Sequence, residues 1–150
     1  MAQDLPQIAA RALVLDANIV LRAVLGRRAR TLIERYGERI TMLTPASCLA
    51  EVNDYLPALC RKRAWDLAPS QELLQALLGT IQTVELSLLG DFEAEARQRI
   101  ATRDPDDWPV VALALAIDSP VWTEDADFFG AGVATWTTDT VELYLKSDDD

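Results

Sequence analysis

Short apolar segments of strand length alternate along this chain with segments of helical periodicity. The pattern begins at residues 12–16, where four apolar side chains run without interruption until an acid ends them. Uninterrupted apolar runs of about four to eight residues are typical of strands buried on both faces of a parallel sheet. The alternation therefore predicts an α/β fold, a three-layer α/β/α sandwich around a mostly parallel, Rossmann-like central sheet.

The same pattern predicts where each strand and helix lies. Strands are expected at residues 12–16, 40–44, 83–87, 120–125 and 133–137. Helices are expected at residues 17–26, 28–36, 45–56, 69–79, 89–101, 108–117 and 140–146. A chain of 150 residues suffices for one hydrophobic core, so we expect a single domain over residues 1–150. The acidic residues 147–150 are expected to be a frayed tail.

The composition excludes several kinds of active site. The chain has no histidine, which removes Ser-His-Asp and Cys-His catalysis and the common histidine-containing zinc sites. Cys48 and Cys60 lack the spacing of a paired motif and are interpreted as reduced thiols. Neither a secretion signal nor an apolar run of the ~20 residues that span a bilayer is recognisable. We therefore expect a cytoplasmic protein without a membrane segment.

The net charge of −10 is unevenly distributed along the chain. Residues 1–63 hold ten of the 14 basic side chains, whereas residues 64–150 hold 18 of the 24 acidic ones. The basic half could contact phosphate groups even though the protein as a whole is acidic. Solvated helix faces are the alternative explanation for these arginines, and the sequence leaves both open.

Acidic residues follow the predicted strands at the points where ligands collect in α/β sheets. Asp16 ends the first strand, and Asp125 and Asp127 follow the fourth. Asp107 precedes the helix that leads into that fourth strand, and Glu51 lies one turn inside the helix after the second. Because the carboxyl ends of parallel strands meet at one edge, these side chains are expected to converge.

Each acid also has a structural explanation. Asp104, Asp106 and Asp107 could cap a helix, although one cap needs only one of them. Glu51 could lie on a solvated helix face, and Asp127 could form an Asx turn. Taken together, however, four or more carboxylates at one edge repel one another unless a cation neutralises them. A hard divalent ion with oxygen ligands, Mg²⁺ or Mn²⁺, is the natural counter-charge.

Four motifs together resemble the PIN-domain nucleases. They are LDANIVL around Asp16, the Ser47 and Glu51 pair, RDPDDWPVVALALA around Asp107, and WTEDADFFG around Asp125. They span nearly the whole chain in the order and spacing of that family. The resemblance implies an α/β/α sandwich with an acidic pocket for Mg²⁺ or Mn²⁺, and within the family the chain is similar to VapC-type toxin ribonucleases.

The resemblance also implies a role for individual residues. Asp16, Glu51, Asp107 and Asp125 correspond to the catalytic acids that bind the metal. Positions that often support the site are occupied by Asn18, Thr123 and Asp127. Asp106, next to Asp107, stays open as an alternative third acid.

The function implied is a metal-dependent endoribonuclease, the toxin of a type II toxin–antitoxin system. Its expected partners are an RNA substrate and an antitoxin protein, and a homodimer is left open. Arg22, Arg27 and Arg28 are candidates for contact with RNA or with the antitoxin. One rival is a haloacid-dehalogenase-like phosphatase with Asp16 as nucleophile, but Asn18 stands where its second acid is needed. The other rival is an acidic pocket that binds a metal or a partner without catalysis.

Overall fold

A computed structural model describes residues 5–6, 8 and 11–146, and the expected tail at 147–150 lies outside these residues. Five parallel strands form one central sheet in the order β3-β2-β1-β4-β5. The strands are β1 (Arg11–Leu15), β2 (Ile40–Pro45), β3 (Ile81–Val84), β4 (Val121–Trp122) and β5 (Thr135–Trp136). The predicted α/β fold is confirmed, and in the described residues the sheet is parallel throughout.

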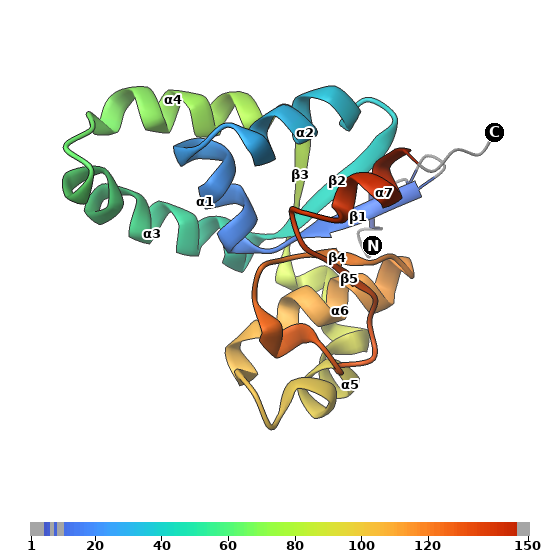
Figure 1. The fold of residues 1–150 in the computed structure, drawn as a ribbon. Helices are drawn as coiled ribbons and strands as arrows, with labels where there is room; N and C mark the ends of the chain where they lie inside the picture. Colours follow the sequence, from blue (N-terminus) through green and yellow to red (C-terminus); the bar gives the residue numbers. More distant parts are fainter. Residues whose placement is uncertain (1–4, 7, 9–10, 147–150) are drawn as a thin grey trace.

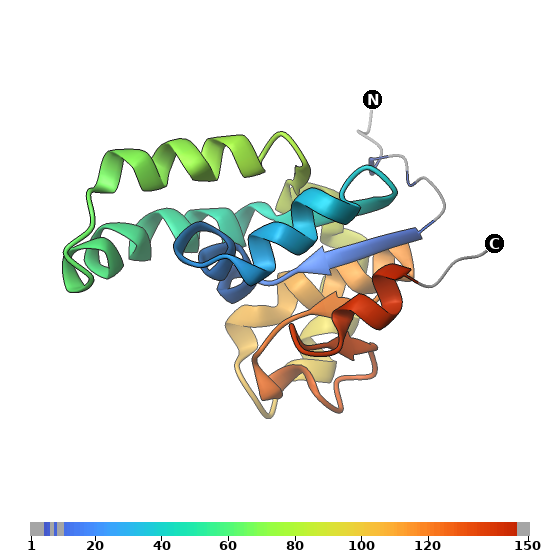
Figure 2. The same ribbon diagram turned by 45° about the horizontal axis from the view of Figure 1, so that its top comes forward.

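Helices cover both faces of the sheet (Figure 1). They are α1 (Ala17–Leu25), α2 (Arg28–Tyr36), α3 (Ala46–Lys62), α4 (Leu67–Leu77), α5 (Gly90–Ile100), α6 (Trp108–Ile117) and α7 (Val141–Lys146). Helices α1 to α4 lie on one side, and α5 and α6 lie on the other, as the turned view also shows (Figure 2). These are the three layers that the alternating pattern predicts.

The central strand β1 and the helix α6 are buried because they consist almost entirely of apolar residues. In β1 the four residues from Ala12 to Leu15 are almost entirely shielded from solvent, because strands lie on both sides and helices on both faces. Helix α6 packs against β1, β2 and α5, and seven of its ten residues are buried. A helix that is apolar on all sides needs such cover. In the part of the chain that the structure describes, no helix has both the length and the apolar character required to cross a bilayer.

Helix α3 is longer than expected and contains a proline. The predicted end at Leu56 is wrong, since the helix continues to Lys62 with Pro57 inside it. Val52, Leu56 and Cys60 recur every four residues and form one buried stripe that holds the helix together past the proline. The carbonyl that loses its hydrogen bond to Pro57 belongs to the exposed residue Asn53, so solvent can reach it.

The last three strands are displaced or shorter than expected. Strand β3 ends at Val84, and Leu86 and Ser87, predicted as strand, belong to the 3₁₀ helix Leu86–Leu89. Strands β4 and β5 each have two residues, where six and five were predicted. After Trp122 the chain turns, because the hydroxyl of Thr123 accepts a hydrogen bond from the backbone N–H of Asp125 at 2.9 Å. The short β4 therefore delivers an acidic loop directly to the edge of the sheet.

Candidate metal centre

The site begins where β1 and β4 end side by side. Leu15 and Trp122 are paired in the sheet, so the residues that follow them, Asp16 and Thr123, lie next to each other. Asp16 is also the N-cap of α1, and its Oδ1 accepts a hydrogen bond from the backbone N–H of Ala17 at 2.8 Å. A carboxylate in this position satisfies a free N–H at the positive end of the helix. The same residue thus ends a strand, starts a helix and faces the site.

Asn18 and Thr123 hold the second oxygen of Asp16. Asp16 Oδ2 accepts hydrogen bonds from the Thr123 hydroxyl at 2.8 Å and from Asn18 Nδ2 at 2.9 Å. Asn18 Oδ1 in turn accepts from the backbone N–H of Glu124 at 3.2 Å. These bonds fix the Asp16 carboxylate and tie α1 to the loop after β4. The supporting positions expected from the sequence, Asn18 and Thr123, therefore contact Asp16 directly.

Three further carboxylates converge beside this pair. Oxygens from Asp107, Asp125 and Asp127 all lie within 4.8 Å of one another. Asp107 is the N-cap of α6, where the short 3₁₀ helix Pro105–Asp107 passes into α6. Asp125 caps the 3₁₀ helix Ala126–Phe128, with its Oδ1 accepting from the backbone N–H of Asp127 at 2.9 Å. The Asp127 carboxylate joins the cluster as well, although only a supporting position was expected for it.

Glu51 lies across an acidic cleft from these aspartates. The cleft has a volume of about 530 Å³. It is lined by Ser47, Ala50, Glu51, Asp54, Tyr55, Asp104, Asp106 and Asp107. We call it the acidic cleft. Five of its eight lining residues are acids, so its potential is strongly negative and attracts cations.

Burial and mutual repulsion raise the pKa values of three of these acids. The pKa of Asp107 rises to about 7, chiefly through burial and then through repulsion from Asp16, Asp104, Asp125 and Glu51. Burial also raises the pKa of Asp16, against the hydrogen bonds from Thr123 and Ala17. The pKa of Glu51 is raised by burial and by the charges of Asp16 and Asp104. These couplings show that the acids from four separate segments share one electrostatic environment.

The structure distinguishes the two neighbouring candidates for the third acid. Asp107 is partly buried and points its carboxylate into the cluster with Asp125 and Asp127. Asp106 is exposed and lines only the acidic cleft. Asp104 accepts a hydrogen bond from the backbone N–H of Asp106 at 3.1 Å, which is the capping role expected for it. The geometry therefore favours Asp107 over Asp106.

The donor set fits a divalent cation. Four ion pairs form within the described residues, and none involves Asp16, Glu51, Asp107, Asp125 or Asp127. Two ligands on opposite sides of one Mg²⁺ are about 4.2 Å apart, so the 4.8 Å cluster needs only a small side-chain adjustment. Hard oxygen donors without histidine or thiolate select Mg²⁺ or Mn²⁺ over zinc.

Residues 14–146 match the PIN domain family. The chain belongs to that family. Solved structures agree with the fold of this PIN domain. PAE2754 from Pyrobaculum aerophilum has a TM-score of 0.70 at 16% identity, covering 93% of this chain and 92% of that one.

Two toxin–antitoxin structures are also similar to this PIN domain. VapBC2 from Rickettsia felis, bound to a DNA fragment from its promoter, has a TM-score of 0.66 at 15% identity, over 84% of this chain and 98% of that one. A toxin–antitoxin complex from Klebsiella pneumoniae has a TM-score of 0.60 at 19% identity, over 84% and 97% of the two chains. Similarity at these identities establishes the shared fold alone. No curated protein matches the sequence.

Two residues that sequence reasoning passed over also contact the site of this PIN domain. The buried thiol of Cys48 lies 4.0 Å from Asp16 Oδ1, and burial raises its pKa, so it stays protonated and can donate to that oxygen. Tyr55, 54% exposed, stands in the acidic cleft one turn after Glu51. Cys48 follows Ser47 of the family motif, but nothing in its spacing signals contact with a residue 32 positions earlier.

The buried hydroxyl of Thr123 gives a first prediction. In Thr123→Val, Asp16 loses one donor and the Asp125 N–H loses its acceptor. We expect the free energy of unfolding to fall by about 1–3 kcal/mol and Mg²⁺ affinity to fall by about 10–100-fold. Urea denaturation and calorimetric Mg²⁺ titration measure the two effects. Thr123→Ser keeps the hydroxyl and is the matched control, and wild-type Mg²⁺ affinity in the valine variant would contradict this role.

Proposed function

We propose that this PIN domain is a Mg²⁺- or Mn²⁺-dependent endoribonuclease and the toxin component of a type II toxin–antitoxin system. The observation that carries the proposal is the cluster of Asp107, Asp125 and Asp127 oxygens within 4.8 Å, beside Asp16. In the part of the chain that the structure describes, no arginine or lysine forms an ion pair with these aspartates. Such a carboxylate group binds hard divalent ions, which serve phosphoryl transfer. Membership of the PIN domain family supports the same chemistry.

Each acid has a distinct task in this proposal. Asp107, Asp125 and Asp127 would hold the ion, and Asp16, fixed by Asn18 and Thr123, would stand behind or beside it. When bound, the ion supplies charge neutralisation and lowers the pKa of a water molecule. Glu51 is more exposed than Asp16 and has a raised pKa, so it is suited to accept a proton from the attacking water. Hydrolysis would then leave a 5′-phosphate and a 3′-hydroxyl.

The toxin assignment rests on the kind of protein whose solved structure is similar to this chain. The matched structures include VapBC2 and a toxin–antitoxin complex, each covered almost completely by this chain. We therefore include an antitoxin protein among the proposed partners, with RNA as the substrate. A homodimer and a cytoplasmic location stay predictions from the sequence.

The geometry argues against the phosphatase alternative. Such a phosphatase needs a second acid two residues after the nucleophile, and that position holds Asn18, which donates its Nδ2 to Asp16 Oδ2. Within the described range 11–146, the two lysines, Lys62 and Lys146, are both exposed and neither lines the acidic cleft. The positive partner of an aspartyl-phosphate is therefore lacking.

The test is cleavage of single-stranded RNA by the purified protein with Mg²⁺, with Mn²⁺ and with chelator. We expect cleavage only with metal, and we expect Asp16→Asn to abolish it. The asparagine keeps the shape of the side chain, so circular dichroism should show an intact fold. Full activity in Asp16→Asn would refute the assignment. Metal binding without cleavage of any RNA or DNA would favour the non-catalytic alternative.

A further inference from the structure

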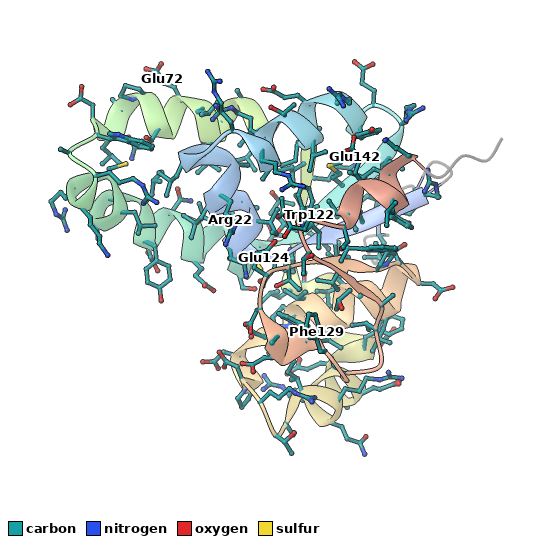
Figure 3. All side chains as sticks on the ribbon, viewed as in Figure 1. Arg22, Glu72, Trp122, Glu124, Phe129 and Glu142 are labelled. Atoms are coloured by element: carbon teal, nitrogen blue, oxygen red, sulfur yellow. The ribbon has the colours of Figure 1, made fainter. Side chains whose placement is uncertain are left out.

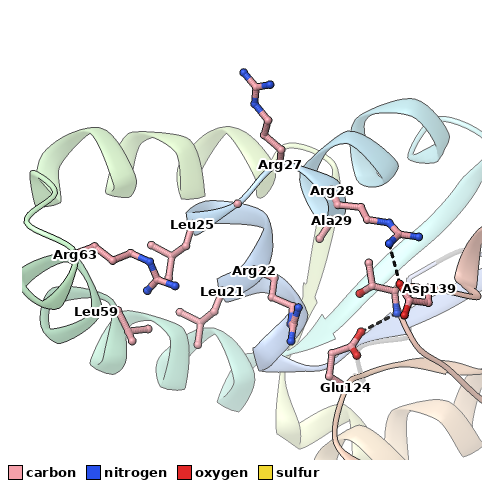
Figure 4. Close-up of a pocket in the computed structure, with 12 residues that line it drawn as sticks. Leu21, Arg22, Leu25, Arg27, Arg28, Ala29, Leu59, Arg63, Glu124 and Asp139 are labelled. Atoms are coloured by element: carbon pink, nitrogen blue, oxygen red, sulfur yellow. Dashed lines mark hydrogen bonds and ion pairs between the residues drawn. The ribbon is translucent and has the colours of Figure 1, made fainter.

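A second cavity, larger than the acidic cleft, opens beside the metal centre and is rich in arginine (Figure 4). Its volume is about 620 Å³, which is in the usual range for ligand sites. The lining residues come from α1, the start of α2, the end of α3 and three loops. They are Leu21, Arg22, Leu25, Gly26, Arg27, Arg28, Ala29, Leu59, Arg63, Glu124, Thr138 and Asp139. We call this cavity the arginine pocket.

The four arginines differ in what they can offer to a ligand. Arg28 is bound to Asp139 at 2.8 Å, and Arg27 points away from the cavity (Figure 4). Arg22 extends toward the Glu124 end, and Arg63 lies beside Leu25 and Leu59 (Figure 4). Within the described residues the side chain of Arg22 forms no hydrogen bond or ion pair, and the side chain of Arg63 only stacks over Trp65 at 5.6 Å. Two guanidinium groups are therefore available inside the pocket.

The carboxylates of the arginine pocket are already engaged. Glu124 Oε2 accepts a hydrogen bond from the backbone N–H of Thr138 at 2.7 Å. Asp139 is paired with Arg28. Among the residues that the structure describes, no carboxylate is bonded to Arg22 or Arg63. Four arginines outnumber the two acids of the lining, so the pocket suits an anionic ligand.

The arginine pocket adjoins the metal centre through two residues. Arg22 lies one helical turn after Asn18 on α1, so both side chains are on the same face of that helix. Glu124 lies in sequence between Thr123 and Asp125 and donates its backbone N–H to Asn18 Oδ1. Figure 3 shows Arg22 and Glu124 close to each other where α1 meets the loop after β4. The arginine pocket is therefore connected to Asp16 through Glu124 and Asn18.

We propose that the arginine pocket binds the RNA nucleotide next to the scissile phosphate, with Arg22 and Arg63 contacting its phosphates. Leu21, Leu25 and Leu59 provide an apolar wall against which a base can lie. This inference rests on the proposed ribonuclease function. The acidic cleft, with Asp54, Asp104 and Asp106, repels any anionic chain. The choice of RNA over an acidic protein segment rests on the apolar wall, which suits a base, and on the direct link from Glu124 to the hydrogen bonds around Asp16.

Binding and cleavage assays with single arginine variants test the inference. Arg22→Ala and Arg63→Ala are compared with Arg61→Ala, which removes the same charge from an exposed position of α3 outside the pocket. Binding is measured by fluorescence anisotropy of a labelled 12-nucleotide single-stranded RNA, with each change made in the Asp16→Asn protein and Mg²⁺ present. Cleavage kinetics are measured with the same changes in the otherwise wild-type protein.

We expect each pocket variant to weaken RNA binding by about tenfold or more, as for loss of a charged hydrogen bond. The slope of log affinity against log salt should decrease by about 0.7 for each phosphate group that the variant no longer neutralises. KM should rise by a similar factor while kcat and the thermal midpoint stay unchanged. Arg61→Ala should resemble the parent protein, and Arg22→Lys should retain part of the affinity.

Distinct results separate failure of this inference from failure of the proposed function. If the wild type cleaves RNA but Arg22→Ala and Arg63→Ala behave like Arg61→Ala, the pocket assignment is wrong and the nuclease stands. If the wild type cleaves nothing while the pocket variants still lose RNA affinity, the nuclease is wrong and the RNA pocket stands. Unchanged RNA binding together with weakened binding of a polyglutamate peptide would assign the pocket to an acidic protein partner and overturn the inference.

Discussion

Asp107→Asn is expected to abolish metal-dependent cleavage and yet to stabilise the metal-free protein at pH 8. The activity loss should be at least about 100-fold, because replacing even a residue behind a metal ligand costs up to that much. The stabilisation follows from removing a partly buried carboxylate that four neighbouring acids repel. Water screens part of that repulsion, so we expect a rise in thermal midpoint of about 2–4 °C, about 1 kcal/mol for a chain of this size.

The pH dependence has a defined sign. The pKa of Asp107 is about 7 in the folded protein, against an ordinary value of 3.8, so the folded state binds more protons between these values. The stability of the metal-free protein should therefore fall as pH rises from about 4 to about 7. The raised pKa values of Asp16 and Glu51 act in the same direction. A hydrogen bond from Tyr36 lowers the pKa of Glu142 from its ordinary value of 4.5. Glu142 therefore has the opposite effect, and its contribution to stability is lost as pH falls below about 4.5.

Thermal melts in chelator between pH 5 and pH 8 measure this dependence. Mg²⁺ titrations at each pH measure how far the bound ion restores the thermal stability that is lost as pH rises. Asp107→Asn should flatten the pH profile and remove most of the Mg²⁺ stabilisation. Asp106→Asn is the matched control, since Asp106 is adjacent, exposed and outside the three-oxygen cluster. If Asp106→Asn lost activity and Asp107→Asn kept it, the third acid would be Asp106.

Trp122→Ala is expected to have the largest effect on stability. Trp122 is fully buried in β4, between β1 and β5, and its Nε1 donates to Thr138 Oγ1 at 3.1 Å. Removing a buried tryptophan side chain costs about 3–5 kcal/mol. That is a large part of the 5–15 kcal/mol that keeps a typical domain folded.

Urea denaturation of Trp122→Ala and Trp122→Phe separates packing from hydrogen bonding. The phenylalanine variant keeps most of the apolar volume but removes the donor to Thr138, so its loss should be smaller. The backbone N–H of Thr138 also binds Glu124 in the arginine pocket. The phenylalanine variant should therefore change the free energy of RNA binding more than the free energy of unfolding. Equal destabilisation by both variants would show that the hydrogen bond, not the ring volume, is the main contribution.

The sequence predicted the fold because its signals were local. The apolar run of β1 and the end of α1 at Gly26 depend on neighbouring residues alone, whereas the helix predicted over residues 69–79 runs from Leu67 to Leu77. The edge of the sheet where Asp16, Asp107 and Asp125 meet could also be predicted, because parallel strands bring their carboxyl ends together. Strand lengths could not, since β4 ends when the Thr123 hydroxyl binds the Asp125 N–H, an interaction that apolar periodicity does not encode.

Two features of the site depend on contacts between distant segments. The Asp127 carboxylate reaches Asp107 only because the turn after Asp125 directs it back toward the start of α6. Arg63 enters the arginine pocket because α3 continues past Pro57, where the sequence predicted that the helix had already ended. In each case the path of the backbone places the side chain in the site, and the residue types alone did not predict that path.

The strand order has a consequence for the moment at which the metal centre is completed during synthesis of the chain. Asp16 is made before its hydrogen-bond partner Thr123, which lies 107 residues later, directly after the strand that completes the other side of β1. At about 5–20 residues per second, a ribosome needs several seconds or more to make that interval. An unfinished chain that stops before residue 127 lacks at least one acid of the three-oxygen cluster, so a product truncated there has no complete metal centre.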